Sequence, residues 1–126
     1  MTDLKALIID DEEDICFLMT DMLNSLDFQA SSTNHLKDAF ELIALNDYSV
    51  VFLDINLNDG SGLEAIKKIK STSPKTTVIM ISAFDGSAER GIASQRGADF
   101  FIGKPLTKEK IVQALTETHL LNPRAD

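Results

Sequence analysis

Four short apolar runs in this chain each lead into a side chain that can bind a cation or a phosphate. The residues that end or follow these runs are Asp10 and Asp11, Asp54, Ser82 and Lys104. If the runs are parallel strands of one sheet, their carboxyl ends share an edge and these side chains converge there. Three carboxylates so close together repel one another unless a positive charge balances them. The sequence therefore predicts a cation site with a hydroxyl and an ammonium group beside it.

Magnesium suits this set of side chains, because it prefers oxygen ligands and is content with few protein ligands plus water. The absence of thiolate or imidazole donors near the runs argues against zinc or copper. A carboxylate can also accept a phosphoryl group. Asp54 is the candidate acceptor, as the sole acid at its strand end with a turn-rich loop after it. The cation and Lys104 would neutralise charge on a phosphoryl group, and Ser82 could donate a hydrogen bond to it.

Strands that alternate with helices must position these residues. Apolar runs and β-prone segments predict strands at about 4–9, 28–32, 50–53, 76–81 and 100–102. Helical spacing of apolar residues predicts helices at about 13–26, 36–43, 63–69, 88–96 and 107–118. This alternation indicates a doubly wound α/β fold with one five-stranded parallel sheet. We expect the strand order 2-1-3-4-5, which puts the three longest apolar strands in the middle and the ligand site between strands one and three.

Several finer features of the helices can be predicted as well. Asn34 is the expected N-cap of the second helix, and Thr107 is the expected N-cap of the last. Leu18 is one of the expected core positions of the first helix. The helix at 88–96 is weaker, because Gly91 inside it costs about 1 kcal/mol relative to Ala. Asp59, in the loop after Asp54, is expected to face solvent.

Length and composition are those of one globular domain. We assign residues 1–121 to the domain and 122–126 to a tail or the start of a linker. A net charge of −8 argues against binding of nucleic acid or an anionic membrane by this domain itself. The apolar runs are too short to span a membrane. Cys16 is the single cysteine, expected to be a partly buried small hydrophobe, and a cytoplasmic location is the natural expectation.

The motifs in combination resemble those of response-regulator receiver domains, which have a flavodoxin-like fold and belong to two-component signalling systems. The resemblance covers essentially all 126 residues. The matching motifs are Asp10-Asp11-Glu12, Asp54 with the loop glycine Gly62, Ser82-Ala83 and Lys104-Pro105.

The resemblance implies a role for each site residue. Asp54 would be the phosphoacceptor, and Lys104 would pair with the phosphoryl oxygens across a cis Lys104–Pro105 peptide bond. The Mg²⁺ ligands would be Asp11, Asp54 and the backbone carbonyl of Asn56, with Asp10 acting through water. Ser82 and Phe101 would be the switch residues.

The implied function is a phosphorylation-dependent switch in a phosphorelay. A phosphohistidine on a sensor kinase or a histidine phosphotransfer protein would be the phosphoryl donor. The face formed by 88–96, 100–102 and the last helix would bind an output domain, a target protein or a second copy of the domain. Such a domain catalyses only its own phosphorylation and dephosphorylation, so we expect no enzyme in the ordinary sense.

Two other functions remain open at this stage. A phosphoaspartyl-type hydrolase also uses an aspartate at a strand end, but its second acid would stand at Asn56. A receiver-like interaction module that works without phosphorylation is disfavoured, because every position of the site is filled by a suitable residue.

Three residues depart from the common receiver pattern. Asn58 stands where many members have proline, and Phe101 lacks the hydroxyl of the commoner tyrosine. Phe84 is a large apolar residue where a polar one is often found. We expect Asn56 and Phe84 to flank the path of the water that hydrolyses the phosphoaspartate, and Phe84 to slow that reaction.

The Phe84→Glu variant should therefore lose its phosphoryl group faster than the parent protein, because a polar side chain admits and orients water. The measurement is the lifetime of the phosphoaspartate after the donor is removed. An unchanged or longer lifetime contradicts the role given to Phe84.

Overall fold

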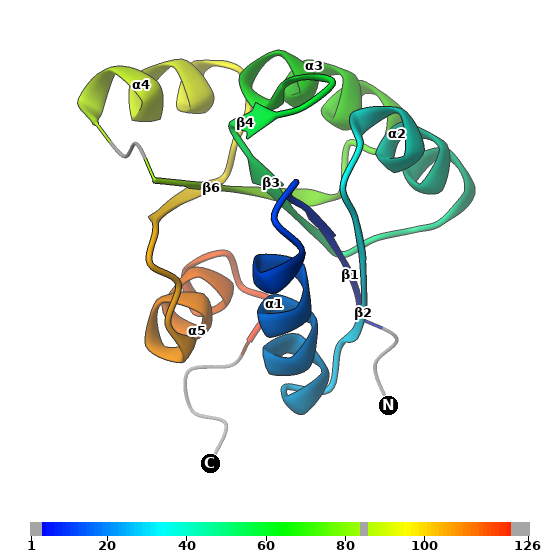
Figure 1. Ribbon diagram of the computed structural model, residues 1–126, viewed down its shortest axis with the longest axis vertical. Coiled ribbons are helices and arrows are strands. Elements are labelled where there is room, and N and C mark those ends of the chain that lie inside the picture. Colours follow the sequence, from blue (N-terminus) through cyan, green and yellow to red (C-terminus); the bar gives the residue numbers. More distant parts are fainter. Residues whose placement is uncertain (1–3, 84–85, 122–126) are drawn as a thin grey trace.

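The computed structural model describes residues 4–83 and 86–121, and its centre is a five-stranded sheet covered by helices on both faces (Figure 1). The strands of this sheet are β1 (Lys5–Ile9), β2 (Gln29–Thr33), β3 (Val50–Asp54), β6 (Thr77–Ser82) and β7 (Phe100–Gly103). The helices are α1 (Glu13–Ser25), α2 (Leu36–Leu45), α3 (Gly62–Thr72), α4 (Ser87–Gln95) and α5 (Lys108–Glu117).

All neighbouring strands of this sheet run parallel, in the order β2-β1-β3-β6-β7. When these five strands alone are counted, the order is 2-1-3-4-5, which confirms the predicted fold class. The loop after β3 contains one element that the sequence analysis did not predict. Its residues form a small antiparallel hairpin of β4 (Asn56–Leu57) and β5 (Gly60–Ser61).

The helices form two layers, with α1 and α5 on one face of the sheet and α2, α3 and α4 on the other (Figure 1). Strand β3 is buried along its length and apolar up to its last residue, Asp54, because it has a core on each side. Phe52 belongs to the core beneath α1 and α5, whereas Val51 and Leu53 belong to the core beneath the other helices. This alternation follows from the two-residue period of a strand.

Helix α1 turns a narrower face to the core than its apolar pattern indicates. Cys16, Met19 and Leu23 fill the face that contacts the sheet. Leu18 lies beside that face and is 42% exposed, so its assignment to the core was wrong. The N-cap predicted for α5 is confirmed, since the side chain of Thr107 accepts a hydrogen bond from the backbone N–H of Lys110. No helix in the described ranges is long and apolar enough to cross a membrane.

Two glycines in helices differ in the space around them, so we expect their replacement by alanine to change the stability of the protein in opposite directions. A methyl group on Gly91, in the middle of α4, would meet no atom within 4 Å. The Gly91→Ala variant should therefore be more stable by about 0.5–1 kcal/mol, because alanine loses less backbone entropy on folding. Urea unfolding measures this difference.

Gly62, the first residue of α3, provides the matched contrast. A methyl group there would clash with the backbone carbonyl oxygen of Asp54. Gly62→Ala should therefore destabilise the protein by about 1–3 kcal/mol. Equal effects of the two substitutions would mean that the packing described around these residues is wrong.

Candidate functional site

The carboxyl ends of four neighbouring strands meet at one edge of the sheet. Strands β1, β3, β6 and β7 end at, or directly before, Asp10 and Asp11, Asp54, Ser82 and Lys104. Strand pairing keeps these ends level, because Asp54 lies opposite Ile81 and Ser82 lies opposite Gly103. The convergence that the apolar runs predict is therefore present in the fold.

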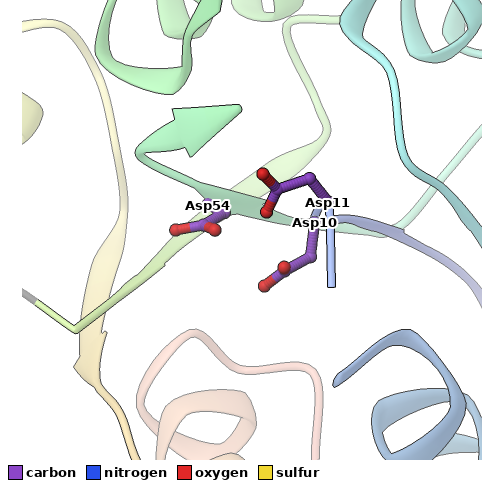
Figure 2. Close-up of side chains that lie close together, drawn as sticks. All are labelled: Asp10, Asp11 and Asp54. Atoms are coloured by element: carbon purple, nitrogen blue, oxygen red, sulfur yellow. The ribbon is translucent and has the colours of Figure 1, made fainter. Parts of the chain in front are cut away.

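Three carboxylates form the centre of the site (Figure 2). One carboxylate oxygen from each of Asp10, Asp11 and Asp54 lies within 4.8 Å of the other two. Asp10 and Asp54 are buried, and Asp11 is partly exposed. The cluster thus opens to solvent on the side of Asp11, where an ion could enter.

Hydrogen bonds to both the side chain and the backbone carbonyl of Asp10 hold this residue in place. Its Oδ1 accepts a hydrogen bond from the backbone N–H of Glu12 at 2.9 Å. Its carbonyl oxygen accepts one from Asn34 Nδ2 at 2.9 Å and one from the Cys16 thiol at 3.3 Å. Asn34 is therefore not the N-cap of α2, since that position belongs to His35 and the Asn34 amide is used by Asp10. Cys16 is more buried than expected, and burial raises the pKa of its thiol.

Lys104 is the basic residue that contacts the carboxylates. Its Nζ lies 3.0 Å from Asp10 Oδ2, 3.1 Å from Glu12 Oε1 and 3.5 Å from Asp54 Oδ2. Burial alone would lower the pKa of Lys104, but its contacts with Asp10 and Glu12 and the charge of Asp54 raise it instead. The backbone N–H of Lys104 donates to the carbonyl of Ser82 at 2.8 Å, and the Lys104–Pro105 peptide bond is cis, the isomer that the resemblance implies.

One lysine does not neutralise the whole cluster. Burial, and then the charge of Asp10, raises the pKa of Asp54 from 3.8 to about 6, against the effect of Lys104. Burial also raises the pKa of Asp10. Asp10 Oδ2 is inaccessible to solvent and has the ammonium group of Lys104 as its charge partner at 3.0 Å. Because the pKa of Asp54 stays raised although Lys104 pairs with both buried carboxylates, the site favours a further cation.

The donor set fits a hard divalent ion. The clustered ligand atoms are carboxylate oxygens, and the side that carries Asp11 can admit the waters that Mg²⁺ keeps. The neighbouring thiol of Cys16 is directed to the carbonyl of Asp10. The site can therefore hold a divalent cation next to a buried carboxylate, which is what transfer of a phosphoryl group to Asp54 requires.

The sequence analysis missed the role of Asp59 in the loop that follows Asp54. The Asp59 carboxylate accepts hydrogen bonds from the backbone N–H groups of Leu36, at 3.0 Å, and Lys37, at 3.3 Å. These bonds, the first of them most, lower the pKa of Asp59. Asp59 is exposed, as predicted, and it also accepts hydrogen bonds from the free N–H groups at the start of α2. No local pattern could reveal a partner 23 residues away.

A comparison with known families gives the same result as the geometry. The family model described as the response regulator receiver domain matches residues 6–116. The chain belongs to this family. Among known receiver proteins, it is 36% identical over 128 aligned positions to the response regulator protein PilR of Pseudomonas aeruginosa. The match covers 100% of this chain and 28% of PilR, so the chain spans less than a third of that relative.

Solved structures share the receiver fold. The chain is similar to the beryllofluoride-activated NtrC4 receiver domain dimer, with a TM-score of 0.84 and 29% identity over 92% of this chain and 94% of that one. A response regulator from Burkholderia pseudomallei, solved with a phosphorylated aspartic acid, a calcium ion and citrate, has a TM-score of 0.86 and 22% identity. That match covers 94% of this chain and 71% of the other, and it supports the fold alone.

The predicted switch residue of the receiver domain lies on its edge strand β7. Phe101 is partly buried and packs against the core beneath α2, α3 and α4. The guanidinium carbon of Arg90, from α4, lies 4.8 Å from the centroid of the Phe101 ring. This cation–π contact joins α4 to β7, so a movement of either residue bears on the other.

The residues predicted to tune hydrolysis can be placed only in part. Asn56 is exposed on β4, and one residue, Ile55, separates it from Asp54 at the end of β3. Phe84 lies outside the described residues, as does the predicted tail at 122–126. The tuning roles of Asn56 and Phe84 therefore stay predictions.

The raised pKa of Asp54 predicts a pH-dependent effect of its removal. The folded protein binds more protons than the unfolded chain between about pH 4 and pH 6, so the contribution of Asp54 to the free energy of unfolding falls as pH rises through this window. At pH 7, without divalent cations, Asp54→Asn should therefore be more stable than the wild type by about 1–3 kcal/mol.

Urea unfolding in EDTA at several pH values measures this gain. The gain should shrink toward pH 4, where the wild-type carboxyl is protonated in the folded and increasingly in the unfolded state. A gain of the same size at pH 4 and pH 7 would contradict the electrostatic account of the site.

Proposed function

We propose that this receiver domain is a phosphorylation-dependent switch that accepts a phosphoryl group on Asp54. The observation that carries the proposal is the buried Asp54 carboxylate beside two further carboxylates and Lys104, at one edge of a receiver sheet. The donor would be a phosphohistidine on a sensor kinase or a histidine phosphotransfer protein. The receiver domain family to which the chain belongs supports this proposal, and a protein of the same fold from Burkholderia pseudomallei was solved with a phosphorylated aspartic acid.

The proposed cation is Mg²⁺. Asp11, Asp54 and the backbone carbonyl of Asn56 would hold it, and Asp10 would act through water. Bound there, Mg²⁺ would neutralise negative charge on the phosphoryl oxygens. The residues themselves fit this proposal because they are hard oxygen donors with incomplete charge compensation.

The transfer step needs little from the protein beyond position and charge. A carboxylate oxygen of Asp54 attacks phosphorus, the P–N bond to the donor imidazole breaks, and the imidazole nitrogen keeps the electron pair. Lys104 would pair with a phosphoryl oxygen, and the hydroxyl of Ser82 would donate a hydrogen bond to another. Lys104 can do so by exchanging one of its carboxylate partners for the new oxygen.

The output of the switch would be a change of the face formed by α4, β7 and α5. Ser82 would move toward the phosphoryl group and Phe101 would turn inward, with its contact to Arg90 altered. A phosphoryl group adds close to two negative charges, and it must favour one state by several kcal/mol to act as a clean switch. An output domain, a target protein or a second copy of this domain would bind that face. The dimer of the NtrC4 receiver domain supports the last alternative.

The same proposal sets the limits of the activity. The domain would catalyse only its own phosphorylation and dephosphorylation, in the cytoplasm. With a net charge of −8, it would bind neither nucleic acid nor an anionic membrane by itself.

Replacement of Asp54 by Asn or Ala should abolish labelling by acetyl phosphate in the presence of Mg²⁺, because the nucleophilic carboxylate is lost. Intact-mass spectrometry and Phos-tag gels measure the label. Asp38→Asn removes an acid from an exposed position on α2 and serves as the control with full labelling. Labelling that persists undiminished in both Asp54 variants would refute the proposal.

A further inference from the structure

Helix α2 begins without a capping side chain of its own. Its N-cap residue, His35, makes no side-chain hydrogen bond to the first turn. The free N–H groups at a helix start need acceptors, and Asp59 supplies them through its bonds to Leu36 and Lys37. The hairpin after Asp54 is thereby tied to the first turn of α2.

The same hairpin packs closely against that turn. Gly60 has a φ of +155° and pairs with Leu57 across the hairpin. A methyl group on Gly60 would lie 2.9 Å from Leu36 Cδ1, so the hairpin approaches α2 as nearly as glycine allows. Asn56, whose carbonyl is a proposed cation ligand, pairs with Ser61 in this hairpin.

The residues that lead into α2 hold the other half of the site. The backbone carbonyl of Thr33, the last residue of β2, accepts a hydrogen bond from the backbone N–H of Asp10 at 3.2 Å. Asn34 donates to the carbonyl of Asp10 at 2.9 Å. The backbone of Asp10 is thus fixed by two consecutive residues, and only His35 separates them from the two residues that bind Asp59.

We propose that residues 33–37 form a bracket that sets the spacing between the two cation-binding segments, with Asp59 and Asn34 as its positioning residues. One end of the bracket holds the backbone of Asp10, and the other holds the hairpin that carries Asn56. Asp59 is not one of the three clustered carboxylates, and its hydrogen bonds go to the first turn of α2. Its bonds limit the positions that the Asn56 carbonyl can take relative to the carboxylates of Asp10 and Asp11. This inference rests on the proposed Mg²⁺ site.

The bracket predicts that Asp59 contributes to cation affinity and not only to the stability of α2. Removal of outer partners of metal ligands commonly weakens binding by 10-fold or more, so Asp59→Ala should raise the Kd for Mg²⁺ about tenfold. Asp59→Asn keeps an acceptor oxygen for one N–H group of α2 and should recover most of the affinity. Asn34→Ala, which frees the other end of the bracket, should also raise the Kd.

Asp38→Ala is the matched control, because it removes an equal charge from an exposed position on the first turn of α2, the turn to which Asp59 bonds. The measurement is calorimetric titration of each variant of this 126-residue chain with MgCl₂ alone, together with urea unfolding in EDTA. The control should keep the wild-type Kd. The Asp59→Ala and Asn34→Ala variants should bind more weakly at temperatures where unfolding shows them to be fully folded.

The outcomes separate the bracket from the function on which it rests. If the wild type binds no Mg²⁺, the proposed cation site fails and the bracket fails with it. If the wild type binds Mg²⁺ and the folded Asp59→Ala variant binds it with the same Kd, Asp59 is a structural cap and the bracket alone is overturned. If Asp59→Ala does not fold, Asp59→Asn and Asn34→Ala decide: wild-type affinity in both overturns the bracket, and weaker binding in Asn34→Ala supports it.

Discussion

The repulsion among the clustered carboxylates is the constraint on which the rest of this structure depends. Two of the three, Asp10 and Asp54, are buried, where charge is poorly compensated by solvent. Lys104 reaches both of them from the end of β7, yet the pKa of Asp54 still rises to about 6. The fold thus buries more negative charge at this site than Lys104 can neutralise. A divalent cation, and then a phosphoryl group held by Lys104, would be stabilised in the same place.

Much of this arrangement could be predicted because it follows from local patterns. An apolar run buried on both faces predicts a central parallel strand, and the polar residue after each run marks the edge where ligands bind. This is why the positions of Asp10, Asp54, Ser82 and Lys104 followed from the sequence once a common sheet was assumed. The lengths of the apolar runs favoured three strands for the middle of the sheet, whereas the full strand order was partly implied by the resemblance to receiver domains.

The errors concern side chains whose partners lie far away in the sequence. Asn34 has the residue type and position of an N-cap, but the carbonyl of Asp10 competes for its amide. The cap of α2 comes instead from Asp59, in the hairpin of β4 and β5 that lies between β3 and α3 in the sequence. Leu18 was misplaced for a related reason, because the width of the buried face of α1 is set by the sheet and α5 rather than by the helical pattern.

If a divalent cation relieves the unbalanced charge at Asp54, its binding must displace the proton wherever Asp54 is protonated. Calorimetric titration of the wild-type domain with MgCl₂ near pH 6, in two buffers of different ionisation enthalpy, measures both binding and proton release. We expect saturable binding of one ion and release of a fraction of a proton equal to the fraction of Asp54 that is protonated before binding, so the apparent enthalpies differ between the buffers. Absence of saturable binding at tens of millimolar MgCl₂, or binding with no proton release at this pH, would contradict it.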